Sequence, residues 1–208
     1  RESFYGLNSP GVNQAIVEHI SKANPKVKVE LIRSIGQRNI RDALQTVLKT
    51  ANDSDSDVRL ESIKVLKDLA EPSHLPKLVD IMVNAKSESE LKEAGKMVSS
   101  VAHKSVGENP AAAVLNVIDS VKDVNVRCVL LETLGSIGDV NSLGVLRTSL
   151  KDDNAEVQTA VVRALSDWPN AAPAADLLKI AQTSDNETCR VLALRGYVRL
   201  IGLDSDRS

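Results

Sequence analysis

Aromatic residues are almost absent, with one Trp, two Tyr and one Phe among 208 residues. A core built almost wholly from Leu, Val, Ile and Ala suits closely spaced helices better than a β-sandwich, whose strands favour aromatic and β-branched side chains. Hydrophobic residues still make up 42% of the chain, which argues against disorder. The composition therefore favours a folded, helical protein.

Cysteine, histidine, long apolar runs and excess charge are also lacking. The only cysteines, Cys128 and Cys189, are too few for a disulfide framework or for a zinc site by themselves. No apolar stretch approaches the ~18 residues needed to span a bilayer. A net charge of −2 argues against nucleic acid as a partner. The chain begins at Arg1 without a methionine, so we expect a piece of a longer protein, with any targeting signal outside it.

A repeated segment runs through the whole sequence. "DVRLESIKVLKDLA" at 57–70 aligns with "NVRCVLLETLGSIG" at 125–138, "EVQTAVVRALSDWP" at 156–169 and "TCRVLALRGYVRLI" at 188–201. Weaker copies lie at 26–39 and 89–102. We number each copy from its first core position, position 0, which is Val27, Val58, Glu90, Val126, Val157 and Cys189. Successive steps are 31, 32, 36, 31 and 32 residues, which indicates a repeat protein.

The residues within each copy follow helical spacing. Apolar or small side chains recur at positions 0, 4, 5, 8 and 11, which places them on one stripe of a helix. A second amphipathic stretch lies between copies, for example "HLPKLVDIMVN". Six helical hairpins are predicted, at about 9–38, 39–70, 73–105, 109–138, 139–168 and 170–203. Because one hairpin cannot bury its stripe alone, we expect them to stack into one all-α domain over 1–208, a right-handed α-α superhelix of the solenoid type.

Capping residues and glycines are expected to mark the helix ends. Ser9 before Pro10, Asn109 before Pro110, and Ser73 are the predicted caps of first helices. The turns "NDSDSD", "KDDNAE" and "TSDNE" separate the two helices of a hairpin and favour the next helix's positive end. Gly135 and Gly138 in "LGSIGD" superficially suggest a phosphate loop, but no strand precedes them and no Gly-Lys-Ser/Thr core follows. We interpret Gly138 as a helix terminator.

The repeat resembles the bacterial HEAT-like repeat. Val-Arg at 58–59 and 126–127 and "LGSIGD" at 134–139 carry the resemblance, from which the third unit departs most. "SDWPNAAPAADLLKIA" and "RVLALRGYVRLIGL" look like HEAT modules of large, often exported bacterial proteins that also carry a 3-keto-disaccharide hydrolase-type domain. That resemblance implies a possible exported or periplasmic location, although no signal lies in this segment.

No catalytic or cofactor-binding constellation is recognisable. His19, His74 and His103 fall in different units, and stacking at ~10 Å per helix would keep them apart. By the same spacing Cys128 and Cys189 lie ~20 Å apart, beyond the ~7 Å between Cα atoms that a disulfide tolerates, so we expect packing residues. "DSDSD" at 53–57 lacks the glycine and terminal Glu of a calcium loop. We expect no enzyme activity, cofactor or metal in this segment.

Basic residues recur at position 6, opposite the buried stripe. This position holds Arg33, Lys64, Lys96, Glu132, Arg163 and Arg195. In HEAT-like proteins that face of the second helix lines the concave surface. In the first three units Glu at position 3 precedes each base, which predicts the intrahelical pairs Glu30–Arg33, Glu61–Lys64 and Glu93–Lys96. The arginines at position 1, Arg59, Arg127 and Arg190, are expected to pair with acids of the turns or of a neighbouring unit.

In the last three units position 3 is apolar, so Arg163 and Arg195 lose their helical acid. Arg199 adds a charge one turn on, and Val191 and Val198 should lie near the same face. Apolar surface beside unpaired arginines is typical of partner-binding patches. The candidate binding residues are Arg163, Arg195, Arg199, Val129 and Leu192. The competing explanation is that Leu192 and Val198 cover an adjoining domain of the same chain.

Three functions follow as hypotheses. The leading one is a non-catalytic scaffold that binds another protein, or an adjoining domain of its own chain, with the concave face. The alternative is an accessory domain of a larger carbohydrate-active enzyme. A weaker alternative is nucleic-acid binding along the basic column, as in some HEAT-like DNA glycosylases.

Overall fold

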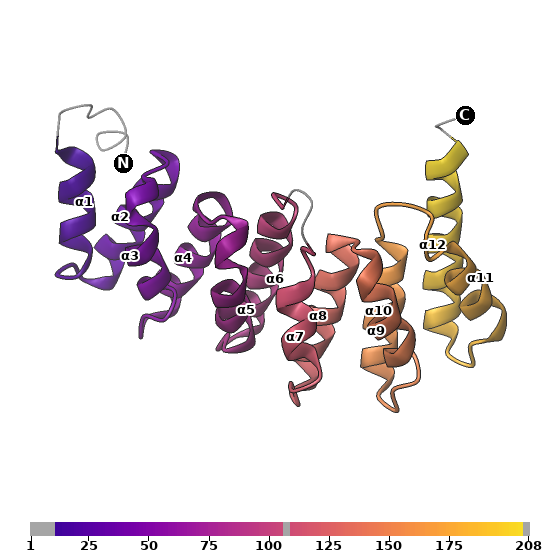
Figure 1. Cartoon of the computed structure of the whole chain (residues 1–208). Helices are drawn as coiled ribbons and strands as arrows, with labels where there is room; N and C mark the ends of the chain where they lie inside the picture. The colour runs from indigo at the N-terminus through magenta and orange to yellow at the C-terminus, as the bar shows by residue number, and fades with distance from the viewer. Residues whose placement is uncertain (1–10, 106–108, 206–208) are drawn as a thin grey trace. The chain divides into compact units, whose positions relative to one another are not determined.

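The computed structural model of the chain describes residues 11–105 and 109–205, and these residues form twelve α-helices and no strand (Figure 1). The all-α fold predicted from the repeat is confirmed. The chain divides into two compact units, Arg1–Val101 and Ala102–Ser208, which are described separately.

The first unit contains three helical pairs. Their helices are α1 (Val12–Ile20), α2 (Pro25–Gln37), α3 (Leu44–Thr50), α4 (Ser56–Leu69), α5 (Leu75–Val83) and α6 (Glu88–Ala102). The 3-10 turns η2 (Arg41–Ala43) and η3 (Pro72–His74) lead into α3 and α5. In the first two pairs the first helix packs on the second, α1 on α2 and α3 on α4, and the second helices α2 and α4 also pack together.

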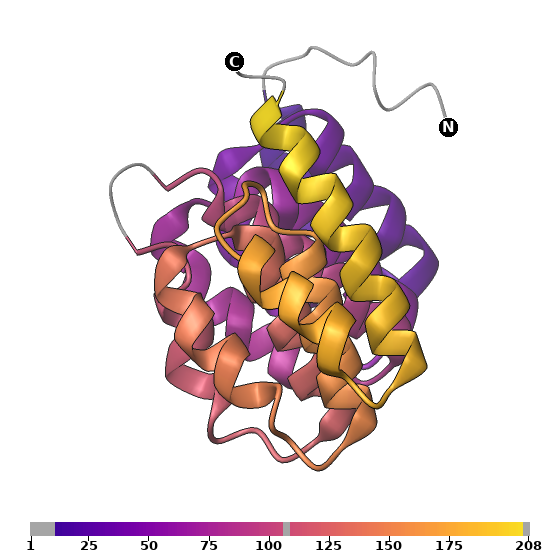
Figure 2. The same cartoon turned by 90° about the vertical axis from the view of Figure 1, so that its right-hand side faces the viewer.

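The second unit repeats this arrangement. Its helices are α7 (Ala112–Ile118), α8 (Val124–Ile137), α9 (Leu143–Ser149), α10 (Ala155–Ser166), α11 (Ala174–Thr183) and α12 (Glu187–Ser205), with η4 (Val140–Ser142) before α9. The second helices α8, α10 and α12 pack in that order, and α11 lies against α12 (Figure 2). The second helices of this unit therefore form one layer.

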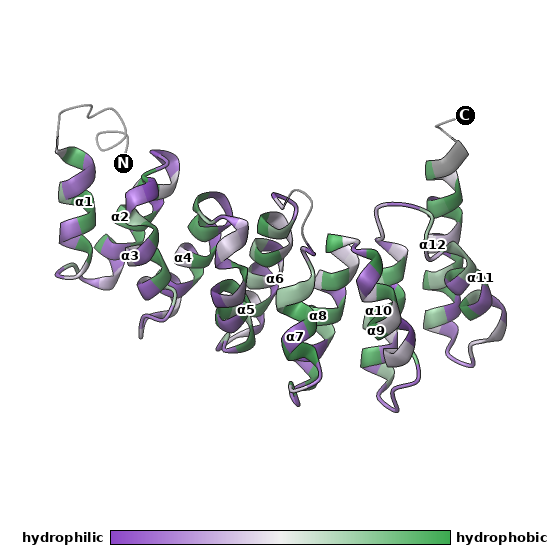
Figure 3. Cartoon of the chain, viewed as in Figure 1, coloured by the Kyte–Doolittle hydropathy of each residue, from purple (hydrophilic) through white to green (hydrophobic). Residues whose placement is uncertain are grey.

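The stripe predicted from the repeat is the core. In α8, Val126, Leu130, Leu131, Leu134 and Ile137 have exposed fractions of 8, 0, 0, 0 and 6%. Trp168, predicted as a core residue, is 1% exposed, whereas the turns between helices are largely hydrophilic (Figure 3). Burial of one stripe per helix is thus the main stabilising term in both units.

All six second helices begin with a side-chain cap three residues before position 0. The backbone N–H at position 0 donates to that side chain over 3.0–3.4 Å in every repeat. The capping residues are Asn24, Asp55, Ser87, Asp123, Asn154 and Asn186. The expectation that the polar turns start the second helices is therefore confirmed, and the capping atom in each turn is identified.

The predicted caps of the first helices are wrong where the structure describes them. Ser73 lies inside η3, and α5 follows from His74, which makes no side-chain cap. The cap position of α7 is Ala111, while Asn109 offers its backbone carbonyl to Ala112 N–H at 3.2 Å. These helices open through tight turns, so the polar residue that precedes them is not at the cap. Ser9 and Pro10 lie outside the described residues.

Glycines allow the second helices to approach closely. A Cβ on Gly135 of α8 would lie 2.4 Å from the Ala164 carbonyl oxygen of α10. Gly36 faces Val65 between α2 and α4, and Gly196 of α12 faces Ser166 of α10. Each contact joins position 9 of one repeat to position 7 of the next. Gly138, as predicted, ends α8 in the left-handed region, at φ 70°.

Candidate interaction surface

Groups that could perform chemistry are dispersed. Within residues 11–105 and 109–205 no three His, Cys, Asp or Glu side chains are placed to hold a metal ion. Both cysteines are free; Cys189 is buried and Cys128 is half-buried. Burial, reinforced by Glu132 and Glu156, raises the pKa of the Cys128 thiol, which disfavours the reactive thiolate.

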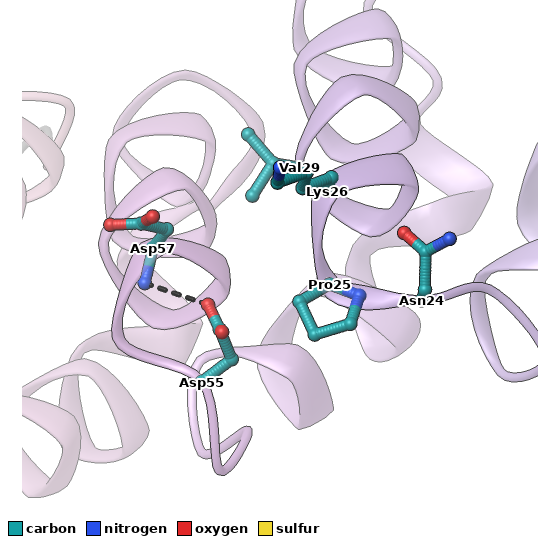
Figure 4. Close-up of a pocket in the computed structure, with 6 residues that line it drawn as sticks. All are labelled: Asn24, Pro25, Lys26, Val29, Asp55 and Asp57. Carbon is teal, nitrogen blue, oxygen red and sulfur yellow. Dashed lines mark hydrogen bonds between the residues drawn. The ribbon is translucent and has the colours of Figure 1, made fainter.

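A shallow cavity of about 440 Å³ lies at the starts of α2 and α4 (Figure 4). Its lining residues are Asn24, Pro25, Lys26, Val29, Asp55 and Asp57. Asp55 Oδ1 already accepts the N–H groups of Asp57 and Val58, at 3.0 and 3.2 Å. Two of the lining side chains, Asn24 and Asp55, are therefore engaged in capping α2 and α4.

Cations at position 1 connect successive second helices. Lys28 binds Asp53 at 2.7 Å, and Arg127 binds Asp152 at 2.6 Å. Both acids lie five residues before position 0 of the following repeat. Each acid accepts a backbone N–H two residues on and then the cation, and these bonds lower the pKa of Asp53 and Asp152. The expected pairing of Arg127 with an acidic turn is confirmed.

The third repeat has Ala85 in place of that acid and compensates with Glu90 at position 0. The Arg59 guanidinium reaches Glu90 at 2.7 Å, and the two residues are 7 and 2% exposed. Arg59 also donates to the Asp53 and Ser54 carbonyls, at 2.9 and 2.8 Å. Burial opposes ionisation of Glu90, but hydrogen bonds from Arg59 and from the Lys86 N–H outweigh it and leave the pKa lowered. Arg59 is structural.

At position 6 the first unit is largely self-neutralised. The predicted pairs Glu30–Arg33 and Glu93–Lys96 form, at 3.0 and 2.9 Å. Glu61 accepts two bonds from Arg33, at 3.0 and 3.1 Å, instead of pairing with Lys64. The predicted Glu61–Lys64 pair is therefore wrong: Arg33 and Lys96 have acidic partners, whereas Lys64 is exposed and has no ion pair within the described residues.

In the second unit, the expectation that Arg163 lacks an acid is wrong. Arg163 lies 3.7 Å from Glu132, which occupies the same position on α8, and both side chains are largely exposed. The sequence analysis considered acids on the same helix only. An exposed pair at this distance contributes little, so the Arg163 guanidinium is still available to a partner.

Arg195 is the candidate arginine that has no ionic partner in the described residues. It is exposed on α12, and its guanidinium has no ion pair or hydrogen bond with any residue of the described ranges. It occupies position 6, like Arg163 on the adjacent α10. Two arginines thus stand at the same position on neighbouring helices, with Glu132 beside one of them.

The other candidate residues face their neighbours. The Arg199 guanidinium donates to the Ser166 and Trp168 carbonyls, at 2.5 and 2.6 Å, so it caps the end of α10. Leu192 is half-buried, and its carbonyl accepts from Ser166 Oγ at 3.3 Å. Val129 is also half-buried. Arg199 is therefore not the free charge that the sequence suggested.

Apolar side chains remain exposed on α12. Of the seven large hydrophobic side chains that are exposed in the described residues, five lie on this helix: Val191, Leu194, Val198, Ile201 and Leu203. The sequence analysis identified Val191 and Val198 but missed Leu194 and Ile201. Position 5, which Leu194 occupies, is buried in the other repeats, so the periodicity alone predicted the opposite. None of the described helices is long and apolar enough to cross a membrane.

Comparison with known proteins agrees with this architecture. The chain is similar to the structure of the complex of CpcE and CpcF of phycocyanin lyase from Nostoc sp. PCC7120. The match covers 96% of this chain and 97% of that chain, with 14% identity and a TM-score of 0.53. An engineered protein is similar over 91% of this chain and 96% of its own, with 17% identity and a TM-score of 0.50. No curated protein sequence matches the chain.

The family comparison covers most of both units. The model for HEAT repeats matches residues 13–97 and 111–196, which are the two sets of helical pairs described above. The chain belongs to the HEAT repeat family.

Proposed function

We propose that this chain is a non-catalytic scaffold that binds an acidic segment of another protein on the exposed side of α10 and α12. The observation that carries the proposal is the exposed Arg195, which has no ionic partner in the described residues, next to Arg163 on the adjacent helix. Val129 and Leu192, half-buried in the same layer, offer apolar contact at its edges.

The chemistry of the surface favours a peptide with alternating acidic and apolar side chains. A carboxylate that approaches Arg195 gains a charge-assisted hydrogen bond without first breaking an ion pair of that arginine. At Arg163 the partner competes only with the 3.7 Å contact to Glu132. The similar CpcE–CpcF structure is a complex of two proteins, which supports a protein partner for this fold.

A peptide selection tests the proposal. Random twelve-residue peptides displayed on phage are selected on the intact chain, and the bound peptides are titrated against variants. We expect enrichment of Asp and Glu, and a loss of affinity of at least ~10-fold in R163E/R195E, because each substitution replaces attraction by repulsion.

Lys179→Glu is the matched control. Lys179 is exposed on α11, in the other helix layer of the same unit, and its charge change equals that of each single arginine substitution. The Lys179→Glu variant should bind the selected peptides with the affinity of the wild-type chain. Peptides of no particular charge, or equal binding by R163E/R195E with an unchanged circular dichroism spectrum, would refute the proposal.

Nucleic acid is the second candidate partner, and it must be distinguished from an acidic peptide because the same arginines would attract phosphate. The expected result is no binding of a duplex oligonucleotide at micromolar protein, since the net charge is −2 and aromatic residues make up only 2% of the chain. An accessory role beside a carbohydrate-active domain is the further alternative that the sequence resemblance offers, and no feature of the described surface favours it.

A further inference from the structure

The exposed apolar residues of α12 form a single stripe. Val191, Leu194, Val198 and Ile201 are 43, 54, 58 and 44% exposed. Their spacing of three or four residues places them on one side of the helix. This side differs from the one that carries Arg199, which points back to the end of α10.

In α8 and α10 the following second helix covers the same side. Position 5, which is Leu194 in α12, is Leu131 in α8 and Val162 in α10, 0 and 1% exposed. Position 9, which is Val198 in α12, is Gly135 in α8, where it lies against Ala164 of α10. The α12 stripe therefore corresponds to the surface on which one repeat receives the next.

The charge at the edge of the stripe follows the same pattern. Arg127 on α8 and Lys28 on α2 each bind an aspartate five residues before position 0 of the following repeat. Arg190 occupies the equivalent position on α12. It is exposed, and its side chain has no ion pair or hydrogen bond with any residue of the part that the structure describes.

The size of the side chains specifies the opposing surface further. Where second helices pack closely, which are the pairs α2–α4, α8–α10 and α10–α12, one of the two residues at positions 9 and 7 is glycine: Gly36 with Val65, Gly135 with Ala164, and Ser166 with Gly196. Position 9 of α12 is the branched Val198. A helix that packs here at the same distance therefore needs glycine at its position 7.

We propose that α12 is a docking face for a helical hairpin of a HEAT-type partner. The second helix of that hairpin carries glycine at position 7 and an apolar stripe, and the turn before it carries an acid that pairs with Arg190. The face buries apolar area and completes an ion pair in one step, which is the combination seen between α8 and α10.

A second copy of this chain does not meet these requirements at its first hairpin. Lys22 occupies the place of the acid, five residues before Val27, and would oppose Arg190 with like charge. Position 7 of that repeat is Ser34, not glycine. Head-to-tail association of two copies is therefore disfavoured, and the partner is a different helical-repeat surface.

An appended hairpin tests the proposal on the full chain. A second copy of residues 170–203, which brings glycine at position 7, is joined after Ser208, where linkage provides a high effective concentration. The acidic version carries Ser184→Asp in the copy, and the basic version carries Ser184→Lys there. Hydrogen exchange of α12 amides is measured by mass spectrometry in the unextended, acidic and basic proteins.

The acidic hairpin should slow exchange in α12 by at least ~10-fold, and the basic hairpin should slow it much less. Leu194→Glu in the original α12 should abolish this protection, whereas in the unextended chain it should leave Tm within ~2 °C, since that side chain is exposed. If Leu194→Glu unfolds the chain, Ile201→Glu replaces it.

Three results would overturn the proposal. One is unchanged exchange in α12 with the acidic hairpin. Another is equal protection by the acidic and basic hairpins, which would make Arg190 irrelevant. The third is sedimentation of the unextended chain as a dimer that Leu194→Glu dissociates, which would identify a second copy as the occupant.

Discussion

The ion pair between Arg59 and Glu90 stands in the place of two features found in other repeats, which are valine at position 0 and an aspartate five residues before it. Position 0 is Val in four repeats, and an aspartate precedes it by five residues in two of them. In the third repeat the acid has moved into position 0 itself, where it is 2% exposed. The pair therefore explains why this repeat departs from the pattern without losing the connection to α4.

We predict that Arg59→Ala lowers the free energy of unfolding by ~3–5 kcal/mol, because it leaves the Glu90 carboxylate buried without its partner. The double variant R59L/E90V, which restores valine at position 0, should recover most of this loss. Urea unfolding measures both. A loss below ~1 kcal/mol in Arg59→Ala would mean that Glu90 reaches water.

Stability should depend on pH in the acid range. The folded-state pKa values of Glu90, Asp53 and Asp152 lie below their unfolded values, so the unfolded chain binds more protons as the pH falls. The stabilisation that these groups provide is complete above the unfolded values of ~4 and is lost as the pH falls through the folded ones. Thermal unfolding between pH 2 and 7 should show this decline, and E90Q should flatten it.

Single-residue roles could be predicted from the sequence only when they were local. Trp168 in the core and Gly138 at a helix end follow from position in the repeat. The partners of Arg163 and Arg199 could not be predicted in this way. They lie on or just after the preceding second helix, and their contacts depend on how two second helices are rotated against each other. Position 6 is acidic in one repeat, Glu132, and basic in the next, Arg163, and a comparison of successive repeats at this position would have predicted the Arg163–Glu132 pair.

At the scale of the element, the caps separate the two kinds of helix. The second helices begin with a side-chain cap at a fixed position, and the first helices α3, α5 and α9 begin through 3-10 turns. The sequence predicted the polar turns correctly but misplaced the caps of the first helices, because a Ser or Asn next to a proline fits both a cap and a tight turn.

Asn154→Ala should therefore destabilise the chain by ~1 kcal/mol, since it removes the acceptor for the Glu156 and Val157 N–H groups. Ser73→Ala is the contrasting variant. It should change the free energy of unfolding by less than ~0.5 kcal/mol. Equal effects in chemical denaturation would contradict the assignment of the caps.

Close approach of α8 and α10 gives another prediction. Gly135→Ala places a Cβ against the Ala164 backbone and should cost ~1–3 kcal/mol, although alanine favours helix. Gly144→Ala in α9 has no heavy atom within 4 Å of the added Cβ and should be neutral or stabilising. A calorimetric Tm for each variant shows whether the clash of the added Cβ or the helix propensity of alanine dominates at each site. A stabilised Gly135→Ala would refute the close packing of α8 on α10.

At the scale of the whole molecule, the repeat distributes side chains instead of gathering them. Each helix buries one stripe of side chains in the core. The histidines and cysteines belong to different repeats and therefore lie on different helices or turns. The repeat and its helical pairs follow from sequence periodicity, and the family follows from the resemblance of segments such as Val-Arg at 58–59 and "LGSIGD" at 134–139. Which exposed side chains are free does not, because it depends on ion pairs such as Arg163–Glu132 and on caps such as Arg199.

On the proposed function, binding takes place on the second-helix layer of the second unit. A hydrogen-exchange footprint of the whole chain, with and without a selected acidic peptide, tests this most directly. We expect slower exchange in α10 and α12 when the peptide is bound, and we expect this protection to be lost in R163E/R195E and kept in Lys179→Glu. Protection confined to the first helices α9 and α11, or left intact by R163E/R195E, would contradict it.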